Sequence, residues 1–279
     1  MNTTKPKKND AKKIFKEKGT CSRTFEYILN REFGNDLADE ERAADPLAGG
    51  IMRKGHQCGM LWGATLAIGA EAYRRTKDIN NASAIAISAT QNMMDSFEKR
   101  TKSVNCKDIT GCTMDNFFGL AIFMVKVTLQ GMNNSTCFNL AEDWYKEAIQ
   151  SAKEGFSKNQ NNIPVDAINC ASEVVRRIGG TEEEMAMVAG FAGGMGLSGN
   201  GCGALSAAIW YRSLEWVRQN PEKSAFNNKE AKAILKSFLK ETQGKMVCSQ
   251  ICGRDFKSIE EHSDYLKIGG CQKILYTLN

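Results

Sequence analysis

The sequence contains ten cysteines and only two histidines, so any metal or redox chemistry it performs would rest on sulfur. In a reducing compartment, a cysteine-dense chain is more often a metal or redox protein than one held by structural disulfides. A buried free cysteine also serves as a small hydrophobic residue, so the number of thiols does not settle the matter. Their spacing along the chain has to decide it.

The cysteines fall into two matching sets because the chain contains an internal duplication. The segment LAGGIMRKGHQCGMLWGA, residues 47–64, aligns without a gap with FAGGMGLSGNGCGALSAA, residues 191–208. In each half a cysteine precedes this segment, and a C-x-x-I-x-G motif and a last cysteine follow it. Cys112 and Cys252 have no counterpart, and each could replace a ligand, bridge two centres or simply pack. The two sets of four are Cys21, Cys58, Cys106 and Cys137, and Cys170, Cys202, Cys248 and Cys271.

The predicted positions of the thiols would favour the thiolate form. Cys58 and Cys202 each follow a glycine-rich loop and open a predicted helix, and Cys21 and Cys170 also lie at predicted helix starts. Unpaired N–H groups and the positive end of a helix dipole lower the pKa of a thiol at such a place. The loops can also turn several N–H groups toward one point, which forms a nest for anionic sulfur. The glycines expected to bind a cofactor are Gly49, Gly50, Gly59, Gly193, Gly194 and Gly203.

Three kinds of centre fit four thiolates gathered from four separate segments: an iron–sulfur cluster, zinc, or a pair of redox-active disulfides. Structural zinc sites and thioredoxin-like sites generally use CxxC pairs, and the chain contains none. Single cysteines spread along a chain more easily surround a larger inorganic core, so the spacing favours an iron–sulfur cluster. The chain also lacks CxxCH, GxxxxGK[ST] and any recognisable Ser/His/Asp or paired-carboxylate set, which excludes covalent c-type haem and disfavours nucleotide binding.

The two histidines are predicted to contribute little. His56 lies two residues before Cys58, but Asn200 takes the matching place in the second half, so we interpret His56 as an exposed loop residue. His262, in the segment EEHSDY, is expected to lie on the solvated face of a helix.

Length and charge are those of an ordinary folded protein. The 279 residues suffice for two domains, and 42% hydrophobic with 25% charged residues argues against disorder. The net charge of +5 comes from residues 1–18, which hold seven lysines and two acidic residues. We expect a solvated basic tail there and no nucleic-acid function. No apolar stretch reaches the roughly 20 residues of a membrane span, and no secretory signal is visible, so a cytoplasmic protein is expected.

Hydrophobic spacing predicts an all-α protein with two pseudo-symmetric helical lobes. Asn169 can cap a helix over CASEVVRRI, and Thr181 followed by three glutamates opens the next. The segment GALSAAIWYRSLEWVRQ is typical of a buried helix that ends before Asn220-Pro221. The polar stretch SKNQNNIP indicates the boundary between the halves. The predicted divisions are a basic tail at residues 1–18, a first, degenerate repeat at 19–160 and a second repeat at 161–279. The residues expected in the core include Trp62, Met93, Met94 and Trp210.

This pattern resembles the redox-active family named for its C_GCAxxG_C_C cysteine pattern. The resemblance is strongest over residues 168–271, where Ala207 replaces the last glycine of the motif. The first half is similar to a degenerate copy, with Met60 in place of the motif's alanine. The residues that match the motif in the second half are Cys170, Cys202, Gly203, Ala204, Cys248, Gly253 and Cys271.

The resemblance implies iron–sulfur binding and electron transfer, because the split-Soret cytochromes, which look like relatives, carry an iron–sulfur centre beside their haems. Members of the family often come from anaerobes. We therefore predict an iron–sulfur redox protein with one cluster per repeat, ligated by the two sets of four cysteines. A thiol–disulfide oxidoreductase and a zinc or soft-metal binding module are the alternatives. The expected partner is a redox protein, and a homodimer is the assembly considered.

Overall fold

The computed structural model describes residues 10–158 and 167–279, and it is all-α, as predicted. Within these ranges it contains fifteen α-helices, three short 3-10 helices and no strand, only two isolated β-bridges. None of these helices is long and apolar enough to cross a membrane. The first half contains α1 (Asp10–Lys18), α2 (Cys21–Phe33), α3 (Ala38–Ala43), η1 (Asp45–Leu47), α4 (Gly59–Thr76), α5 (Ile79–Thr101), α6 (Cys106–Thr110), α7 (Phe117–Gln130), η2 (Met132–Asn134) and α8 (Thr136–Lys158). The second half contains α9 (Cys170–Arg177), α10 (Glu182–Ala189), α11 (Gly203–Gln219), η3 (Ala225–Asn227), α12 (Lys229–Glu241), α13 (Cys248–Cys252), α14 (Ile259–Lys267) and α15 (Gln272–Thr277).

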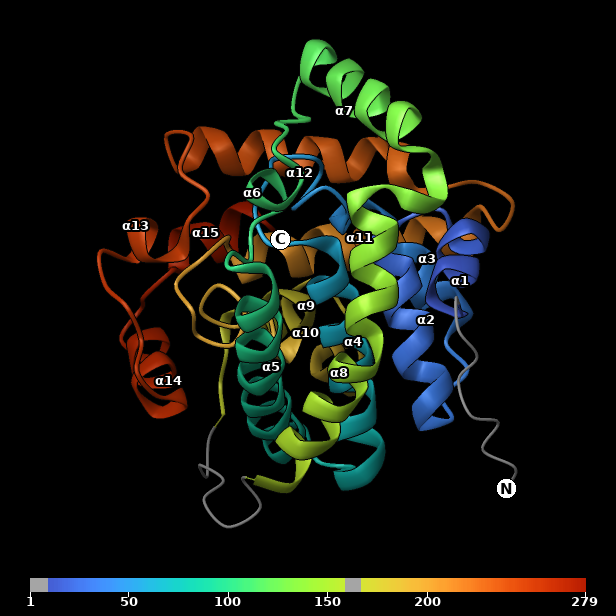
Figure 1. Cartoon of the computed structure of the whole chain (residues 1–279). Helices are drawn as coiled ribbons and strands as arrows, with labels where there is room; N and C mark the ends of the chain where they lie inside the picture. Colours follow the sequence, from blue (N-terminus) through green and yellow to red (C-terminus); the bar gives the residue numbers. More distant parts are fainter. Residues whose placement is uncertain (1–9, 159–166) are drawn as a thin grey trace.

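Helix α4 lies in the middle of the molecule, against α2 and α5 of its own half and α10 of the other (Figure 1). A Cβ at Gly63 would lie 1.9 Å from the Ser22 carbonyl oxygen in α2, and one at Gly69 would lie 2.2 Å from the Ala186 carbonyl oxygen in α10. Glycine at these two positions therefore lets the backbones of three helices approach closely. As a result, α4 is buried continuously over residues 59–72.

The helix starts predicted in the second half are confirmed by their caps. The Asn169 side chain accepts a 2.8 Å hydrogen bond from the Ser172 N–H at the start of α9. Thr181 and Glu184 form a reciprocal capping box at the start of α10, which satisfies two N–H groups that would otherwise lack partners. Helix α11 ends at Gln219, directly before the predicted stop.

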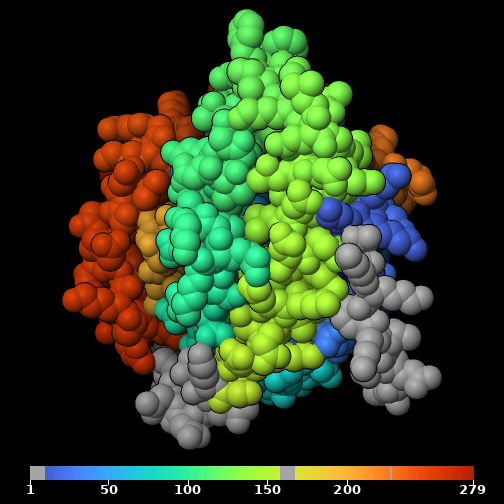
Figure 2. Space-filling view, viewed as in Figure 1, coloured from blue at the N-terminus to red at the C-terminus, as the bar shows by residue number. Residues whose placement is uncertain are grey.

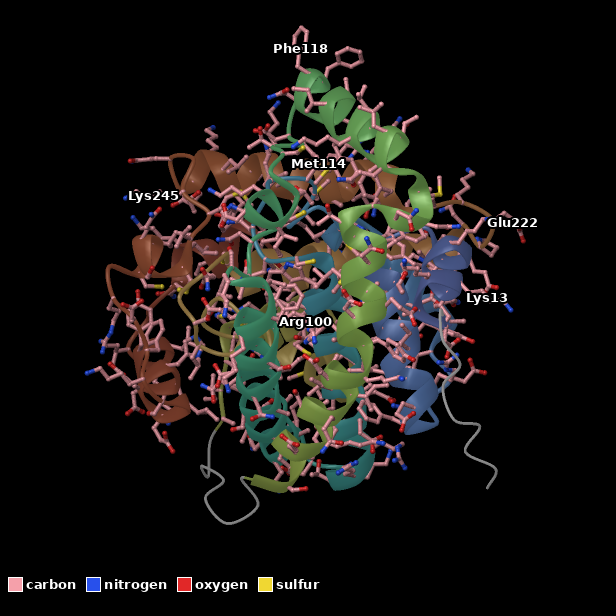
Figure 3. All side chains as sticks on the ribbon, viewed as in Figure 1. Lys13, Arg100, Met114, Phe118, Glu222 and Lys245 are labelled. Atoms are coloured by element: carbon pink, nitrogen blue, oxygen red, sulfur yellow. The ribbon has the colours of Figure 1, made fainter. Side chains whose placement is uncertain are left out.

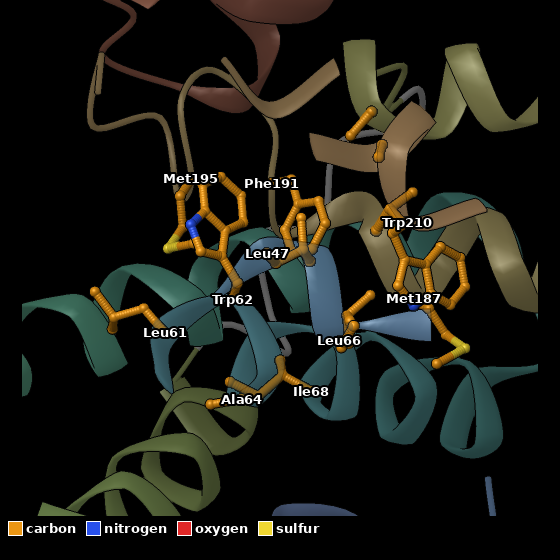
Figure 4. Packing of buried hydrophobic residues seen from close by; sticks show 14 of the residues in the cluster. Leu47, Leu61, Trp62, Ala64, Leu66, Ile68, Met187, Phe191, Met195 and Trp210 are labelled. Carbon is orange, nitrogen blue, oxygen red and sulfur yellow. The ribbon is translucent and has the colours of Figure 1, made fainter. Parts of the chain in front are cut away.

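One hydrophobic core joins the two halves of the chain. Trp62 of α4 packs edge-on against Phe191 of the second half, with ring centroids 4.7 Å apart, and Figure 4 shows both rings within the same buried cluster. In the other direction, the Trp210 indole N–H donates a 3.2 Å hydrogen bond to the Glu40 carbonyl. Because both halves build the same core, two separate lobes are not confirmed. The predicted core residues Trp62, Met93, Met94 and Trp210 are all buried.

The start of the chain differs from the solvated tail that was expected. Residues 10–18 form α1, whose Ala11, Ile14 and Phe15 are buried against α2 and α8. Phe15 stacks on Phe138 with ring centroids 4.4 Å apart. Apolar side chains at helical spacing therefore outweigh the lysines around them. Residues 1–9 and most of the predicted boundary stretch, 159–164, lie outside the described residues.

Helix α7 stands apart from this packed body. It projects beyond the other helices at one end of the molecule in the ribbon and space-filling views (Figures 1 and 2), and the labelled Phe118 points away from the body at its tip (Figure 3). Gly119 is its only buried residue.

Candidate cysteine centres

The two glycine-rich loops share one unusual backbone conformation. Residues 49–53 have five consecutive positive φ angles between 49° and 75°, and residues 193–197 have five between 57° and 84°. Three of the first five and two of the second five are not glycine, and each such residue costs about 1–2 kcal/mol in a left-handed turn. Backbone strain of this kind persists where the surrounding structure fixes it, and it is concentrated at functional sites.

Each loop closes on itself and on the segment that carries the third cysteine of its half. The Gly55 N–H donates to the Gly49 carbonyl at 3.0 Å, and the Gly199 N–H donates to the Gly193 carbonyl at 2.9 Å. The segment around the third cysteine, Cys106 or Cys248, then forms the same two backbone hydrogen bonds with the end of the loop in both halves. The matched bonds run from Cys58 N–H to Val104 (2.8 Å), Cys202 N–H to Met246 (2.8 Å), Cys106 N–H to His56 (2.7 Å) and Cys248 N–H to Asn200 (2.6 Å).

The first centre brings together the thiols of Cys21, Cys58, Cys106, Cys112 and Cys137. The Cys58 thiol donates to the Cys21 sulfur, which lowers the pKa of Cys21 and raises that of Cys58. The Gly49 N–H also donates to the Cys21 sulfur, as expected of a nest. The charges of Cys21 and Cys112 raise the pKa values of Cys106 and Cys137 beyond the effect of burial, so these thiols are electrostatic neighbours.

The second centre gathers Cys170, Cys202, Cys248, Cys252 and Cys271. The Cys252 sulfur lies 3.9 Å from that of Cys248 and 3.6 Å from that of Cys271. Hydrogen bonds donated by these two thiols lower the pKa of Cys252 well below its usual range and raise the pKa values of Cys248 and Cys271. Cys170 accepts a hydrogen bond from the Gly193 N–H, which repeats the contact between Gly49 and Cys21.

The prediction that helix starts lower the thiol pKa is wrong for Cys58, Cys170 and Cys202. Burial raises the pKa of Cys170 to about 11 and that of Cys202 to about 12, and hydrogen bonding to Cys21 together with burial raises that of Cys58. Removal from water and the repulsion of neighbouring sulfur charges outweigh the N–H groups of the helix start. Of the four, only Cys21 has a lowered pKa.

Sequence reasoning left the roles of Cys112 and Cys252 open, and both belong to these centres. Cys252 follows Cys248 by one helical turn, so the two thiols lie on the same face of α13. Cys112 packs in a small buried cluster with Cys106 and Met114. The i, i+4 spacing of Cys248 and Cys252 was the sequence signal that could have placed Cys252 in the centre. A comparison of the two repeats could not detect it, because Cys252 has no counterpart in the first half.

His262 is buried, contrary to the expected solvated position. Its side chain is only 1% exposed, and its ring lies edge-on to Phe256 with centroids 4.9 Å apart. Burial lowers the pKa of His262 to about 4. Tyr265, one turn later in α14, donates its hydroxyl to the Cys252 sulfur. Helix α14 therefore covers the second centre with polar groups. His56, expected to be exposed, is partly buried.

The six glycines predicted to bind a cofactor occupy different positions around the centres. Gly49 and Gly193 donate N–H groups to sulfur, and a Cβ at Gly59 would lie 2.4 Å from the Cys21 sulfur. The other three face backbone instead. A Cβ would lie 2.3 Å from the His56 carbonyl oxygen at Gly50, 2.6 Å from the Asn200 nitrogen at Gly194 and 1.8 Å from the Phe191 carbonyl oxygen at Gly203.

The two loops contact each other through one side chain, Gln57. Its amide nitrogen donates to the carbonyls of Gly194 (2.9 Å) and Gly201 (3.4 Å), and its amide oxygen accepts from the Gly201 N–H (3.1 Å). Gln57 is fully buried, and Gly201 is the residue aligned with it in the second half. The residues preceding Cys58 and Cys202 are therefore joined directly.

The last cysteine of each half lies beside a cavity. Cys271, whose φ of 60° is left-handed, lines a cavity of about 560 Å³ together with Tyr265 and Gly270. Cys137 lines a smaller one of about 170 Å³ beneath α7. Within residues 10–158 and 167–279, no three His, Cys, Asp or Glu side chains are placed to hold a single metal ion.

Comparison with known proteins matches both halves of the chain to one family. The family model described as "Putative redox-active protein (C_GCAxxG_C_C)" matches residues 20–151 and again residues 168–277. The two matched segments agree with a tandem duplication. No curated protein and no solved structure matches the chain.

Proposed function

Because this chain belongs to the C_GCAxxG_C_C family of redox-active proteins, we propose that it relays electrons through cysteine-ligated iron–sulfur clusters, one in each repeat. The observation that carries the proposal is the gathering of all ten cysteines into two groups of five, each beside a left-handed glycine loop. The proposed ligands are Cys21, Cys58, Cys106 and Cys137 in one group and Cys170, Cys202, Cys248 and Cys271 in the other.

The chemistry of the donor residues suits such a group, although no three of the described side chains are placed around a single metal ion. The donors are sulfur atoms, which iron–sulfur clusters take as thiolates. Most of these thiols have raised pKa values because of burial and of neighbouring thiols. Binding would therefore release protons, and the positive charge of the metal would stabilise thiolates that burial alone disfavours. When bound, a cluster supplies a site that gains and loses one electron.

The chain's own contribution is to hold the sulfurs and tune their charge. N–H groups of Gly49 and Gly193 donate to Cys21 and Cys170, and hydrogen bonds to ligating sulfur are one factor that sets cluster potential. Tyr265 and His262 lie beside the second centre alone. We therefore expect the two centres to differ in reduction potential, and we expect another redox protein as the electron partner.

A thiol–disulfide oxidoreductase is the second candidate, favoured by the contacts of Cys252. Its sulfur has a strongly lowered pKa and lies close to two other thiols. In this reaction the Cys252 thiolate attacks an external disulfide, which releases one substrate thiolate and forms a mixed disulfide. Cys248 or Cys271 then loses its proton and attacks Cys252, so that an internal disulfide forms and the substrate leaves as a second thiolate.

Anaerobic purification followed by an absorption spectrum and by iron, sulfide and zinc assays distinguishes these functions. A brown protein with acid-labile sulfide supports the proposal, and Cys202→Ser should then lose about half of the iron. The matched control Ser206→Ala, one turn further along α11, should retain it. A colourless protein that reversibly loses two thiols on oxidation would instead support disulfide exchange, and stoichiometric zinc would support a metal-binding module.

A further inference from the structure

Helix α7 presents an apolar face that nothing in the described structure covers. Phe117, Phe118 and Leu129 are 79%, 78% and 83% exposed, and Ile122, Met124 and Val125 are each more than half exposed. The opposite side of the helix holds it to the body. There, Gly119 packs on Thr113, and Phe123 packs against the cluster of Cys106, Cys112 and Met114. The outward face is therefore exposed although the helix is anchored.

The outward side chains have the spacing of a helix that packs on another helix. Phe118, Ile122, Val125 and Leu129 follow one another at steps of four, three and four residues. This is the alternation that places apolar residues along one seam of paired helices. The chain thus carries one half of a helix-helix contact, with no second helix in the described structure to complete it.

The area of this face suits a stable protein interface. Scaled from roughly 150–250 Å² for an aromatic side chain and somewhat less for an aliphatic one, the exposed parts of the four seam residues Phe118, Ile122, Val125 and Leu129 amount to about 500 Å². The largest apolar patch of a monomer is usually about 300–600 Å², whereas each partner in a standard interface contributes about 800 Å². The seam is therefore as large as the largest apolar patches of monomers, and two copies of it would together bury about 1,000 Å², the lower limit for a specific interface.

Charge favours a protein helix over a lipid surface as the occupant. Helices that lie on membranes carry several Lys or Arg on their polar face. Lys126 is the only charged residue of α7, and its ammonium group donates to the Gly111 carbonyl at 3.1 Å. Since the outward face has no charge, two copies of it can meet without repulsion. We propose that α7 pairs with α7 of a second copy of this chain, as an isologous dimer.

This pairing would have a consequence for the first centre. Helix α7 lies between Cys112 and Cys137 in the sequence and lines the cavity beside Cys137. The dimer therefore has the first cysteine centre of each copy next to the interface. In the second half, the stretch between the third and fourth cysteines of the set, Cys248 and Cys271, contains α14, which lies beside its own centre through His262 and Tyr265.

Sedimentation velocity of the full chain, in reducing anaerobic buffer and over about 1–100 μM, tests the dimer. The molar mass obtained for the wild-type protein should be twice the 30.8 kDa mass of one chain. Val125→Glu and Leu129→Glu should each raise the dissociation constant by about 100-fold or more, because each places an unpaired charge in the seam. Their circular dichroism and thermal unfolding should match wild type, since both side chains are exposed in the single chain.

Ile268→Glu is the matched control, because Ile268 is also 83% exposed but lies outside α7. It should leave the dimer intact. A wild-type protein that stays monomeric at 100 μM, or a dimer that both α7 variants retain, would overturn the proposal. Binding of a monomeric wild type to phosphatidylcholine/phosphatidylserine vesicles that Val125→Glu abolishes would assign the face to lipid instead. None of these readouts depends on the metal content of the protein.

Discussion

Replacing Gln57 with alanine tests whether the contact between the two glycine-rich loops stabilises the folded chain. The substitution removes the acceptor of the Gly201 N–H, which is buried and has no other partner among the hydrogen bonds described. A buried donor left in this state costs about 1–3 kcal/mol. The space left by a fully buried side chain adds about 2 kcal/mol. The Gly194 carbonyl keeps the hydroxyl of Ser198 as a donor, so it adds little.

The sum is a loss of roughly 3–5 kcal/mol in the free energy of unfolding, or a fall of about 10 °C in the melting temperature for a chain of this size. Urea unfolding monitored by circular dichroism measures it. Asn200→Ala is the control on the same loop, because its exposed amide bonds only to Ser198, and it should change stability by less than about 0.5 kcal/mol. A Gln57→Ala protein as stable as the control would refute the reasoning, since the loops would then not depend on this contact.

Two buried titratable groups, Glu26 and His262, lead to predictions about how stability depends on pH. Burial, with repulsion from Glu41 and Glu40, raises the pKa of Glu26 well above its ordinary value of 4.5. The stability that Glu26 contributes is therefore fully present below pH 4.5 and is lost as pH rises from there through the raised pKa of the folded protein. Glu26→Gln should therefore gain stability relative to wild type between pH 4 and pH 7 in urea unfolding, and an unchanged difference would contradict a buried neutral carboxyl. The pKa of His262 is lowered from 6.5 to about 4, so its effect on stability has the opposite sign. The stability that neutral His262 contributes is fully present above pH 6.5, and the free energy of unfolding falls by roughly 3 kcal/mol as pH drops to 4. His262→Phe should flatten that part of the pH profile, whereas a profile as steep as that of wild type would show that other groups cause it.

Much of the fold was accessible from the sequence, because local signals agree with the final structure. Asn169 and Thr181 cap helices through contacts with residues three positions away, which a linear pattern displays. The two glycine segments that align without a gap also carry matching backbone hydrogen bonds in the structure. The sequence signal for α1 was present as well, since Ala11, Ile14 and Phe15 have helical spacing, but the lysines around them led to a different interpretation.

The rest depends on distances that no linear pattern contains. The pKa of Cys202 follows from how much water reaches it and from the charges of Cys170 and Cys252, so the helix-start argument predicted the wrong direction. Likewise, His262 lies in a polar stretch of sequence, and its burial results from the packing of α14 against Phe256. Comparison of the two halves detects what they share, so it could not assign Cys252, which only one half possesses.

The difference between the two halves at residues 57 and 201 explains why they are not interchangeable. A Cβ at Gly201 would lie 2.5 Å from the Gln57 amide oxygen, so the second loop must lack a side chain where the first provides one. Glycine in both loops would leave the Gly201 N–H without its acceptor, and glutamine in both would place two side chains in a space that holds one. The divergence of the copies at this position is therefore complementary. It fixes the backbone before Cys58 relative to the backbone before Cys202, and so holds the two centres in one arrangement although each is built from its own half of the chain.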